Sequence, residues 1–166
     1  MDIYIYSMPK YNNKTRHSNK TNKNNKTRHI RLSNSTSLYS FQKEITMTFL
    51  EMLLMIKLYH WKTYSYATHK ATDELYGKLN ENMDHFIEVL LGKSGERIDL
   101  IKQKSIPLID LTSVEDLKKE IYSFKGYLAS LNNNKAMKQM TNTDLLNIRD
   151  EILGDLNQFL YLLSFK

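Results

Sequence analysis

The chain has 166 residues and a formal net charge of +6, with five glycines, two prolines and no cysteine. This length fits one folded domain, and the scarcity of glycine and proline favours long helices over a loop-rich β-fold. The lack of cysteine excludes disulfides, thiolate zinc sites and a cysteine nucleophile. The longest apolar run, Phe49 to Tyr59, contains Glu51 and Lys57 and is shorter than the ~20 residues that span a bilayer. We therefore expect a soluble, cytoplasmic protein with no membrane partner.

The basic charge is concentrated at the N-terminus. Residues 1–40 hold eight lysines and arginines and one acid, a charge of +7, so residues 41–166 hold 16 basic and 17 acidic residues, a charge of −1. Residues 10–31 have almost no apolar side chains to offset chain entropy. We therefore predict a disordered basic tail over residues 1–38 and a folded domain over residues 39–166. A cationic tail binds polyanions by counterion release, which predicts nucleic acid as a partner; a merely solubilising terminus is the alternative. The candidate nucleic-acid-binding residues are Lys10, Lys14, Arg16, Lys20, Lys23, Lys26, Arg28 and Arg31.

Four later stretches have the apolar spacing of amphipathic helices. They cover residues 41–64, 67–91, 114–131 and 144–163. Gly92 is expected to end the second helix, and Thr112 with Glu115 resembles a capping box at the start of the third. The first helix is apolar on nearly every side over residues 49–59. This predicts an oligomer interface on its second face, and a central helix in a monomer is the alternative.

The connections between these helices predict the topology. The first and last pairs have short connections, so each pair should form an antiparallel hairpin. The middle connection, residues 93–113, is long, contains Pro107 and can carry the chain back along the bundle. Two hairpins joined by one long crossover form the ferritin-like connectivity. We therefore predict an all-α, ferritin-like four-helix bundle, with a short extra helix over residues 98–101.

Two pairs of polar residues on the second helix have the spacing of metal ligands. His69 with Asp73, and Asp84 with Glu88, are each one turn apart, and all four lie within an arc of about 100° on one helix face. Each pair can chelate one ion. Imidazole together with carboxylate suits iron, zinc or manganese. A solvated polar face is the alternative interpretation.

The two pairs cannot share an ion within one helix, because Asp73 and Asp84 are about 16 Å apart along it. Two copies of the helix, packed antiparallel about a two-fold axis near Leu79, would bring the first pair of one chain to the second pair of the other. Such a homo-oligomer would contain two identical sites, each made from both chains. His60, at the end of the first helix, could complete each site.

Residues 58–91 resemble the Dps family of ferritin-like mini-ferritins. The matching motifs are His60–Trp61, His69–Lys–Ala–Thr–Asp73, Leu75–Tyr76 and Asp84–His–Phe–Ile–Glu88. The resemblance implies an intersubunit ferroxidase site that oxidises Fe(II) with peroxide or oxygen, iron sequestration, and DNA binding through a lysine-rich tail. The gap from His60 to His69 is three residues shorter than in bacterial members. This shortened form looks like small proteins of phages and large DNA viruses, which implies a location in the host cytoplasm or the virion.

Two alternatives retain the bundle without iron chemistry: a non-catalytic oligomer that presents nucleic-acid-binding tails, and a viral structural protein. Trp61 and Tyr64 are expected to pack in the core, with interception of radicals as the alternative role. The polar string at residues 149–151 is expected to form a surface or interface salt-bridge patch.

Overall fold

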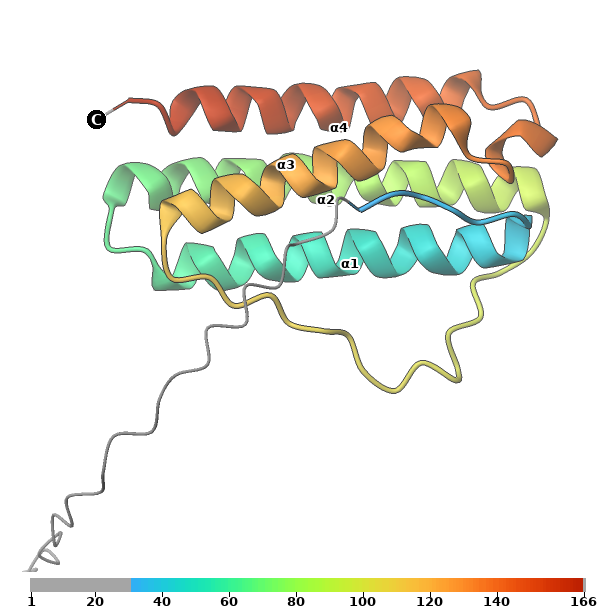
Figure 1. Cartoon of the computed structure of the whole chain (residues 1–166), viewed down its shortest axis with the longest axis horizontal. Helices are drawn as coiled ribbons and strands as arrows, with labels where there is room; N and C mark the ends of the chain where they lie inside the picture. Colours follow the sequence, from blue (N-terminus) through green and yellow to red (C-terminus); the bar gives the residue numbers. More distant parts are fainter. Residues whose placement is uncertain (1–30, 166) are drawn as a thin grey trace, which may run out of the picture.

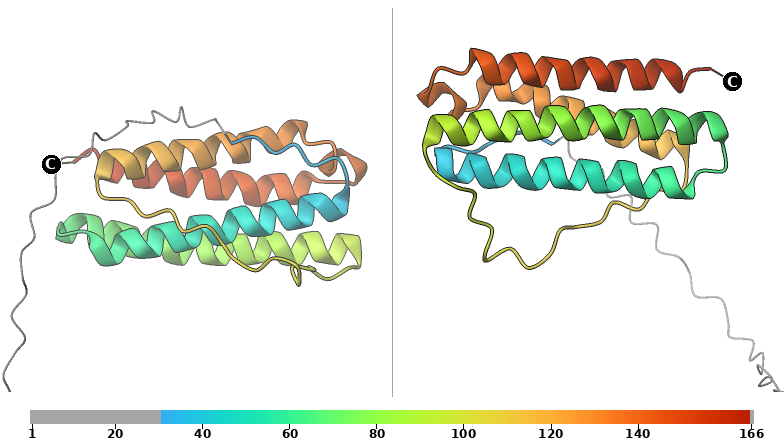
Figure 2. Two further views of the ribbon diagram at one scale, coloured as in Figure 1. Left: turned by 60° about the horizontal axis from the view of Figure 1, so that its bottom comes forward. Right: turned by 180° about the vertical axis from the view of Figure 1, so that it is seen from behind.

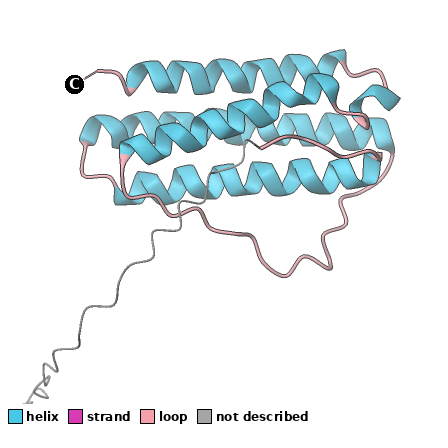
Figure 3. Cartoon of the chain, viewed as in Figure 1, coloured by secondary structure: helices cyan, strands magenta, loops and turns pink. Residues whose placement is uncertain are grey.

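A computed structural model describes residues 31–165, and over this range the chain forms four α-helices and no strand (Figure 1, Figure 3). The helices are α1 (Leu38–Lys62), α2 (Tyr66–Ser94), α3 (Val114–Ser130) and α4 (Thr143–Leu162), and the short 3₁₀ helices η1 (Leu131–Asn133) and η2 (Met137–Gln139) lie between α3 and α4. The helices form two antiparallel hairpins, α1–α2 and α3–α4, joined by the crossover at residues 95–113 (Figure 2). The predicted four-helix, all-α architecture is thus confirmed. Of the tail predicted over residues 1–38, residues 1–30 lie outside the described residues.

One apolar core holds the four helices together. Phe49 of α1 and Phe86 of α2 meet edge to face, with ring centroids 5.4 Å apart. The largest fully buried side chains come from all four helices: Phe41, Ile45, Met52, Met55, Ile56, Leu79, Phe86, Leu90, Leu117, Ile121, Phe124 and Phe159. Each such side chain contributes about 1.5–3 kcal/mol by leaving water. None of the described helices has the length and apolarity that crossing a membrane requires.

Helix α1 is not covered on every side by its own chain. Leu50 and Leu53 are half-buried and Leu54 is 39% exposed. These leucines follow one another at helical spacing, so they form an outer apolar strip of α1. The strip is the part of the predicted second-subunit face that residues 31–165 leave uncovered.

The helix ends differ from those predicted. Gly92 does not end α2, which continues to Ser94; Gly95 ends it with a left-handed φ of 69° and donates its N–H to the Leu91 carbonyl. Glycine adopts this conformation without the steric cost of a Cβ. The N-cap of α3 is Ser113 rather than Thr112, because the Ser113 hydroxyl accepts the N–H of Asp116 at 3.1 Å.

The extra helix predicted over residues 98–101 is also wrong, because the crossover has no helix there. The Asp99 carboxylate accepts the N–H of Ile101 at 3.1 Å, which is the hydrogen bond of a local turn. Ile101 is 86% exposed, so this segment has no buried apolar face to stabilise a helix.

Residues 31–37, here called the N-terminal strap, run between α1 and α3 (Figure 1). The Ser33 N–H donates to the Ser130 hydroxyl at 2.8 Å, and the Asn134 amide donates to the Ser33 hydroxyl at 2.7 Å. The Gln139 amide donates to the Thr36 carbonyl at 2.9 Å. The segment that composition assigned to the tail therefore belongs to the folded domain from Arg31 onward.

The predicted surface patch at residues 149–151 is wrong in one respect, because Arg149 is buried with 4% exposure. Its guanidinium donates to the Leu128 carbonyl at 3.0 Å and to the Asn132 side-chain oxygen at 3.1 Å. The last carbonyls of a helix lack partners within the helix. Arg149 therefore supplies donors to the C-terminal end of α3, and its ion pair with Asp150, at 2.8 Å, remains near the surface.

Candidate metal centre

The α1–α2 turn brings two histidines together from different helices. Only residues 63–65 separate α1 from α2. The turn is short because the Thr63 N–H continues the hydrogen bonding of α1, while the Ser65 hydroxyl accepts the Thr68 N–H at 3.2 Å and caps α2. Antiparallel helices joined in this way place His60, in the last turn of α1, beside His69, in the first turn of α2.

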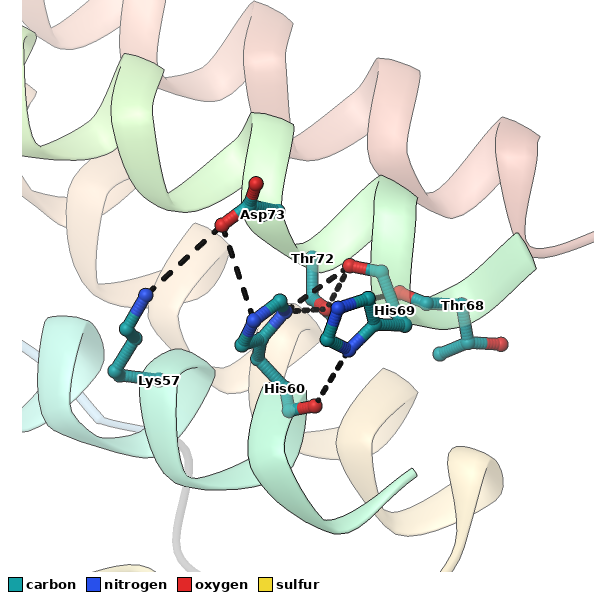
Figure 4. Close-up of polar contacts among 6 residues, drawn as sticks. All are labelled: Lys57, His60, Thr68, His69, Thr72 and Asp73. Atoms are coloured by element: carbon teal, nitrogen blue, oxygen red, sulfur yellow. Dashed lines mark hydrogen bonds and ion pairs between the residues drawn. The ribbon is translucent and has the colours of Figure 1, made fainter. Parts of the chain in front are cut away.

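His60 and His69 form reciprocal hydrogen bonds across the turn (Figure 4). The Nδ1 atom of His60 lies 3.0 Å from the His69 carbonyl oxygen, and the Nδ1 atom of His69 lies 3.1 Å from the His60 carbonyl oxygen. The rings stack with centroids 3.9 Å apart and planes at 23°. His60 is 7% exposed and His69 is partly buried, so the pair is held rigidly at this end of the bundle.

These contacts decide the tautomer of both rings. A carbonyl oxygen only accepts hydrogen bonds, so each Nδ1 must carry the proton. In a neutral ring, each Nε2 then keeps its lone pair. The Nε2 atom of His60 lies 3.8 Å from the Asp73 carboxylate, and the Nε2 atom of His69 makes no hydrogen bond within residues 31–165. A histidine whose Nδ1–H is held by a carbonyl is the usual form of a metal-ligating imidazole.

Thr72 is a supporting residue that the sequence reasoning missed. It is completely buried, and its hydroxyl lies 2.8 Å from the Thr68 carbonyl, 3.0 Å from the His69 carbonyl and 3.2 Å from the Nδ1 atom of His60. A threonine hydroxyl both donates and accepts, so Thr72, on α2, orients the His60 ring (Figure 4). The signal that could have identified Thr72 is its position directly before Asp73, on the inner face of α2.

Lys57 is the second residue that was missed. Its ammonium lies 3.9 Å from the Asp73 carboxylate and 4.7 Å from the Tyr76 ring centroid. The lysine is one turn before His60, a spacing that places both side chains on one face of α1. Lys57 is therefore the counter-ion of Asp73 in this structure, and any metal cation must compete with it for the carboxylate.

Two of the five predicted ligands, His60 and Asp73, approach each other in one chain, and His69 stacks on His60. Two ligand atoms about 2.1 Å from a tetrahedral ion are separated by about 3.4 Å. The 3.8 Å between His60 Nε2 and Asp73 Oδ1 is close to that value. Within residues 31–165, however, no three His, Asp or Glu side chains are arranged closely enough to hold an ion. A single chain thus holds an incomplete set of ligands.

Asp84 and Glu88 are not brought to the histidines. Both are exposed on α2, about 16 Å and 22 Å beyond Asp73 along the helix axis. Asp84 borders an apolar groove of ≈ 230 Å³ between α1 and α2. The groove is lined by Thr46, Phe49, Leu50, Leu53, Asn80, Met83, Asp84 and Ile87.

The aromatic residues next to His60 differ in their surroundings. Tyr59 is 7% exposed, and burial together with the nearby Glu115 raises its pKa above the usual phenol value. Trp61 and Tyr64 are 69% and 106% exposed, so the prediction that both pack in the core is wrong. They lie at the end of α1 and in the turn, where neighbouring helices do not cover them.

A comparison with family models matches residues 60–163 to DUF5856, a family of unknown function. The match covers 104 of the 166 residues. The chain belongs to DUF5856. No curated protein and no solved structure matches the chain. All five candidate ligands lie within the part that matches DUF5856, whereas the eight basic residues of the predicted tail precede it.

Proposed function

We propose that this protein is a Dps-like, ferritin-like oligomer that binds iron at a site shared by two chains. His60, His69 and Asp73 would come from one chain, and Asp84 and Glu88 from the other. The observation that carries the proposal is the reciprocal hydrogen bonding of the histidines. It leaves both Nε2 lone pairs available, with that of His60 3.8 Å from the Asp73 carboxylate, although residues 31–165 of one chain bring no three ligands close enough to hold an ion.

The outer face of the α1–α2 hairpin supports the second chain in this proposal. The apolar groove beside Asp84 lies between α1 and α2, and Leu50 and Leu53 of the apolar strip on α1 line it. An isologous contact places the same patch of both chains on the axis. Burying partly exposed leucines there would favour association by about 25 cal/mol for each Å² removed from water.

The chemistry of the ligand set suits Fe(II) as a substrate. Two neutral imidazoles and up to three carboxylates supply borderline nitrogen and hard oxygen donors, and the carboxylates neutralise the charge of the ion. Fe(II) would be oxidised to Fe(III) by peroxide or oxygen and then sequestered. Zinc and manganese are accepted by the same donors and are the first competitors to test. The Lys57 ammonium and a metal ion are both cations that need the Asp73 carboxylate, so metal binding should displace Lys57 from Asp73.

A mixing experiment tests whether the site is shared. The first variant is His69→Ala and the second is Asp84→Ala with Glu88→Ala; each should lose Fe(II) binding and oxidation under anaerobic titration followed by exposure to peroxide. In a two-fold dimer of one copy of each, one site is doubly damaged and the other is intact. Co-refolding the two variants should therefore restore activity, up to one site per mixed dimer.

Two results would overturn the proposal. If the Asp84→Ala/Glu88→Ala variant binds and oxidises Fe(II) like the parent, these residues are not ligands. If both variants are inactive and mixing restores nothing although light scattering shows mixed oligomers, the site is not shared. Glu81→Ala, which removes another exposed carboxylate of α2, is the matched control and should leave binding unchanged.

The second candidate function is polyanion binding by the basic residues that precede the strap. The observation in its favour is that Arg31, the last of the eight, is held by Glu51 at 2.7 Å, so the sequence that contains the seven others joins the described domain beside α1. Counterion release predicts that log K falls with log salt by about 0.9 for each phosphate neutralised. Replacing those seven residues with glutamine should abolish DNA binding at moderate salt, and an unchanged affinity would reject this role.

A further inference from the structure

One end of the bundle exposes a group of large aromatic side chains. Trp61, Tyr64 and Tyr66, in and beside the α1–α2 turn, are 69%, 106% and 76% exposed, and Tyr161 and Phe165, at the end of α4, are 63% exposed each. The turn and the C-terminus lie at the same end of the molecule (Figure 2). Single exposed apolar residues are normal, whereas a group of them marks an interaction surface. These five residues are here called the aromatic end face.

A hollow of ≈ 930 Å³ lies between the two halves of the aromatic end face. Ala67 and Ala71 line it on the α2 side, where their short side chains leave room, and Leu162 and Phe165 line it on the α4 side. The Tyr161 and Phe165 rings meet edge to face with centroids 4.9 Å apart. These two rings therefore form a projecting apolar knob at the edge of the hollow, so one end of one chain carries both a knob and a hollow.

The exposed area of the aromatic end face suits a protein partner. An aromatic side chain presents about 150–250 Å², so the five rings at their exposed fractions offer roughly 600–900 Å². A stable protein interface covers about 800 Å² of each partner. A small ligand would fill the hollow and leave the outer rings in water. The aromatic end face is therefore large enough for a specific contact with another protein chain.

The charges beside these rings disfavour a strongly charged partner. Two lysines flank Trp61, and both are neutralised within the chain, since Lys57 pairs with Asp73 and Lys62 with Asp110. The centre of a protein interface is likewise rich in tryptophan, tyrosine and phenylalanine and poor in unpaired charge. A second copy of this chain presents such a surface. Because it also presents both a knob and a hollow, two copies are complementary without a third component.

We propose that the aromatic end face binds a second copy of this chain. The Tyr161–Phe165 knob of one copy would pack into the hollow of another, against Ala67 and Ala71. This contact differs from the one on the outer face of the α1–α2 hairpin, where the proposed iron site takes its second chain, because it lies at the end of the bundle. A chain with two separate contacts to its own copies assembles beyond a dimer.

The first test measures the mass of the assembled full chain by light scattering and sedimentation. Tyr161→Ser with Phe165→Ser, the knob variant, removes both rings and should weaken self-association at the end face by at least about 30-fold, the loss typical of interface hot spots. The assembly should then fall to a dimer. Tyr161→Phe keeps the ring and should keep the mass. Tyr122→Ser removes an aromatic side chain that is 60% exposed on α3 and should change nothing.

Two further measurements place the contact at the end face. Trp61 is the only tryptophan in the chain, so its emission should shift to shorter wavelength as the protein concentration rises, and this shift should be absent in the knob variant. The chain has no cysteine, so Ala67→Cys and Ser164→Cys, at exposed positions, each introduce a single thiol. When these two variants are mixed, a bismaleimide should link one to the other, and such a product must join two copies.

A variant of the outer face separates this proposal from the iron proposal. Leu54→Asp places a charge on the apolar strip of α1 and should break the outer-face contact while keeping the end-face contact. A parent larger than a dimer, reduced to a dimer by either change, supports both interfaces. A dimeric parent that only the knob variant dissociates supports the end face and contradicts the shared iron site. A dimer left by the knob variant should still bind Fe(II).

Three results would overturn the end-face contact. The first is a parent that is monomeric, or a dimer that Leu54→Asp dissociates and the knob variant does not. The second is an unchanged mass in the knob variant of a larger assembly. The third is an unchanged mass together with a shift of Trp61 emission on phosphatidylserine vesicles, which would assign the aromatic end face to a membrane surface.

Discussion

His60 and His69 each donate their Nδ1–H group to the main-chain carbonyl of the other, at 3.0 and 3.1 Å. The arrangement has a structural and a chemical consequence. The His60 carbonyl belongs to the last turn of α1, where carbonyls lack partners within the helix, so His69 caps that end of α1. The same bonds keep the proton on each Nδ1 atom. They also point both Nε2 atoms away from the protein backbone.

The structural consequence can be measured in metal-free protein. His60→Phe and His69→Phe keep a ring of similar size but remove one hydrogen bond each, and each should lower the free energy of unfolding by about 0.5–1.5 kcal/mol. The two losses should not add, because the rings are stacked on each other. Urea unfolding in the presence of a chelator measures this.

The matched control for that experiment is His85→Ala, since His85 is exposed on α2, the helix that carries His69. It should change the unfolding free energy by less than about 0.5 kcal/mol. If His60→Phe and His69→Phe were equally silent, the reciprocal hydrogen bonds would have no energetic role, and the tautomer argument for the metal centre would lose its basis.

The N-terminal strap should depend on Arg31. This side chain makes a 2.7 Å hydrogen bond to Glu51 and lies over the Phe124 ring at 4.6 Å. Its side chain is 31% exposed and that of Glu51 is 16% exposed, so solvent screens the pair only in part. Arg31→Ala should lower the unfolding free energy by about 1–2 kcal/mol.

Hydrogen exchange locates that effect. Arg31→Ala should speed the exchange of the Ser33 N–H, which is bonded to Ser130, more than exchange in α2 or α4. Arg97→Ala, an exposed arginine of the crossover, is the control and should do neither. A uniform increase across the whole domain would mean that the strap does not open as a local unit.

Much of this fold could be predicted from the sequence, and the exceptions have physical causes. The four helices follow from apolar periodicity, because each buries one stripe in a common core. The helix ends do not follow from the sequence. Gly92 and Gly95 are both glycines near the end of α2, and only the backbone conformation shows that the helix ends at Gly95. The burial of Arg149 was equally hidden, since its partners are the Leu128 carbonyl of α3 and the Asn132 side-chain oxygen of η1, which are separate elements.

The candidate site was predictable in part for a similar reason. His60 and His69 are nine residues apart across a short turn, so their contact follows from the hairpin. Thr72 and Lys57 were missed because their roles depend on which helix face each presents to the histidines. In the proposed site, the relation of Asp84 and Glu88 to the histidines would involve a second chain, which one sequence does not position.

The two glycines near the end of α2 provide a paired test. Gly95 has a φ of 69°, and a Cβ added there would meet nothing within 4 Å, so Gly95→Ala is penalised by conformation alone. It should lower the unfolding free energy by about 1 kcal/mol. Gly92 lies inside the helix with equally open surroundings, and Gly92→Ala should raise it by about 0.4–1 kcal/mol.

Thermal unfolding of the two variants should therefore shift in opposite directions. The pair shares the chemistry of the change and differs only in backbone conformation, so each is the control for the other. Destabilisation by Gly92→Ala with no effect of Gly95→Ala would place the end of α2 at Gly92, as the sequence predicted, and contradict the structure.

The pH dependence of stability should change when Asp155 is replaced. Burial between α2 and α4 raises the pKa of this carboxyl above its usual value, against the opposing effects of Lys78 and of the Asn82 amide at 2.9 Å. A raised folded-state pKa means that the stabilising contribution of Asp155 is complete below the unfolded pKa, near 3.9. It is lost as pH rises through the folded pKa. Asp155→Asn, which cannot ionise and can still accept from Asn82, should therefore be more stable than the parent at pH 7, by less than about 1 kcal/mol.

This advantage should shrink as the pH is lowered toward 3, because the parent carboxyl then becomes protonated and resembles the amide. Urea unfolding of the parent and the variant between pH 3 and pH 7 measures the difference. Glu81→Gln removes a negative charge from an exposed position on α2 and controls for the change in net charge. An Asp155→Asn variant less stable than the parent at pH 7, with the gap closing in acid, would show that Lys78 and Asn82 outweigh burial at this carboxylate.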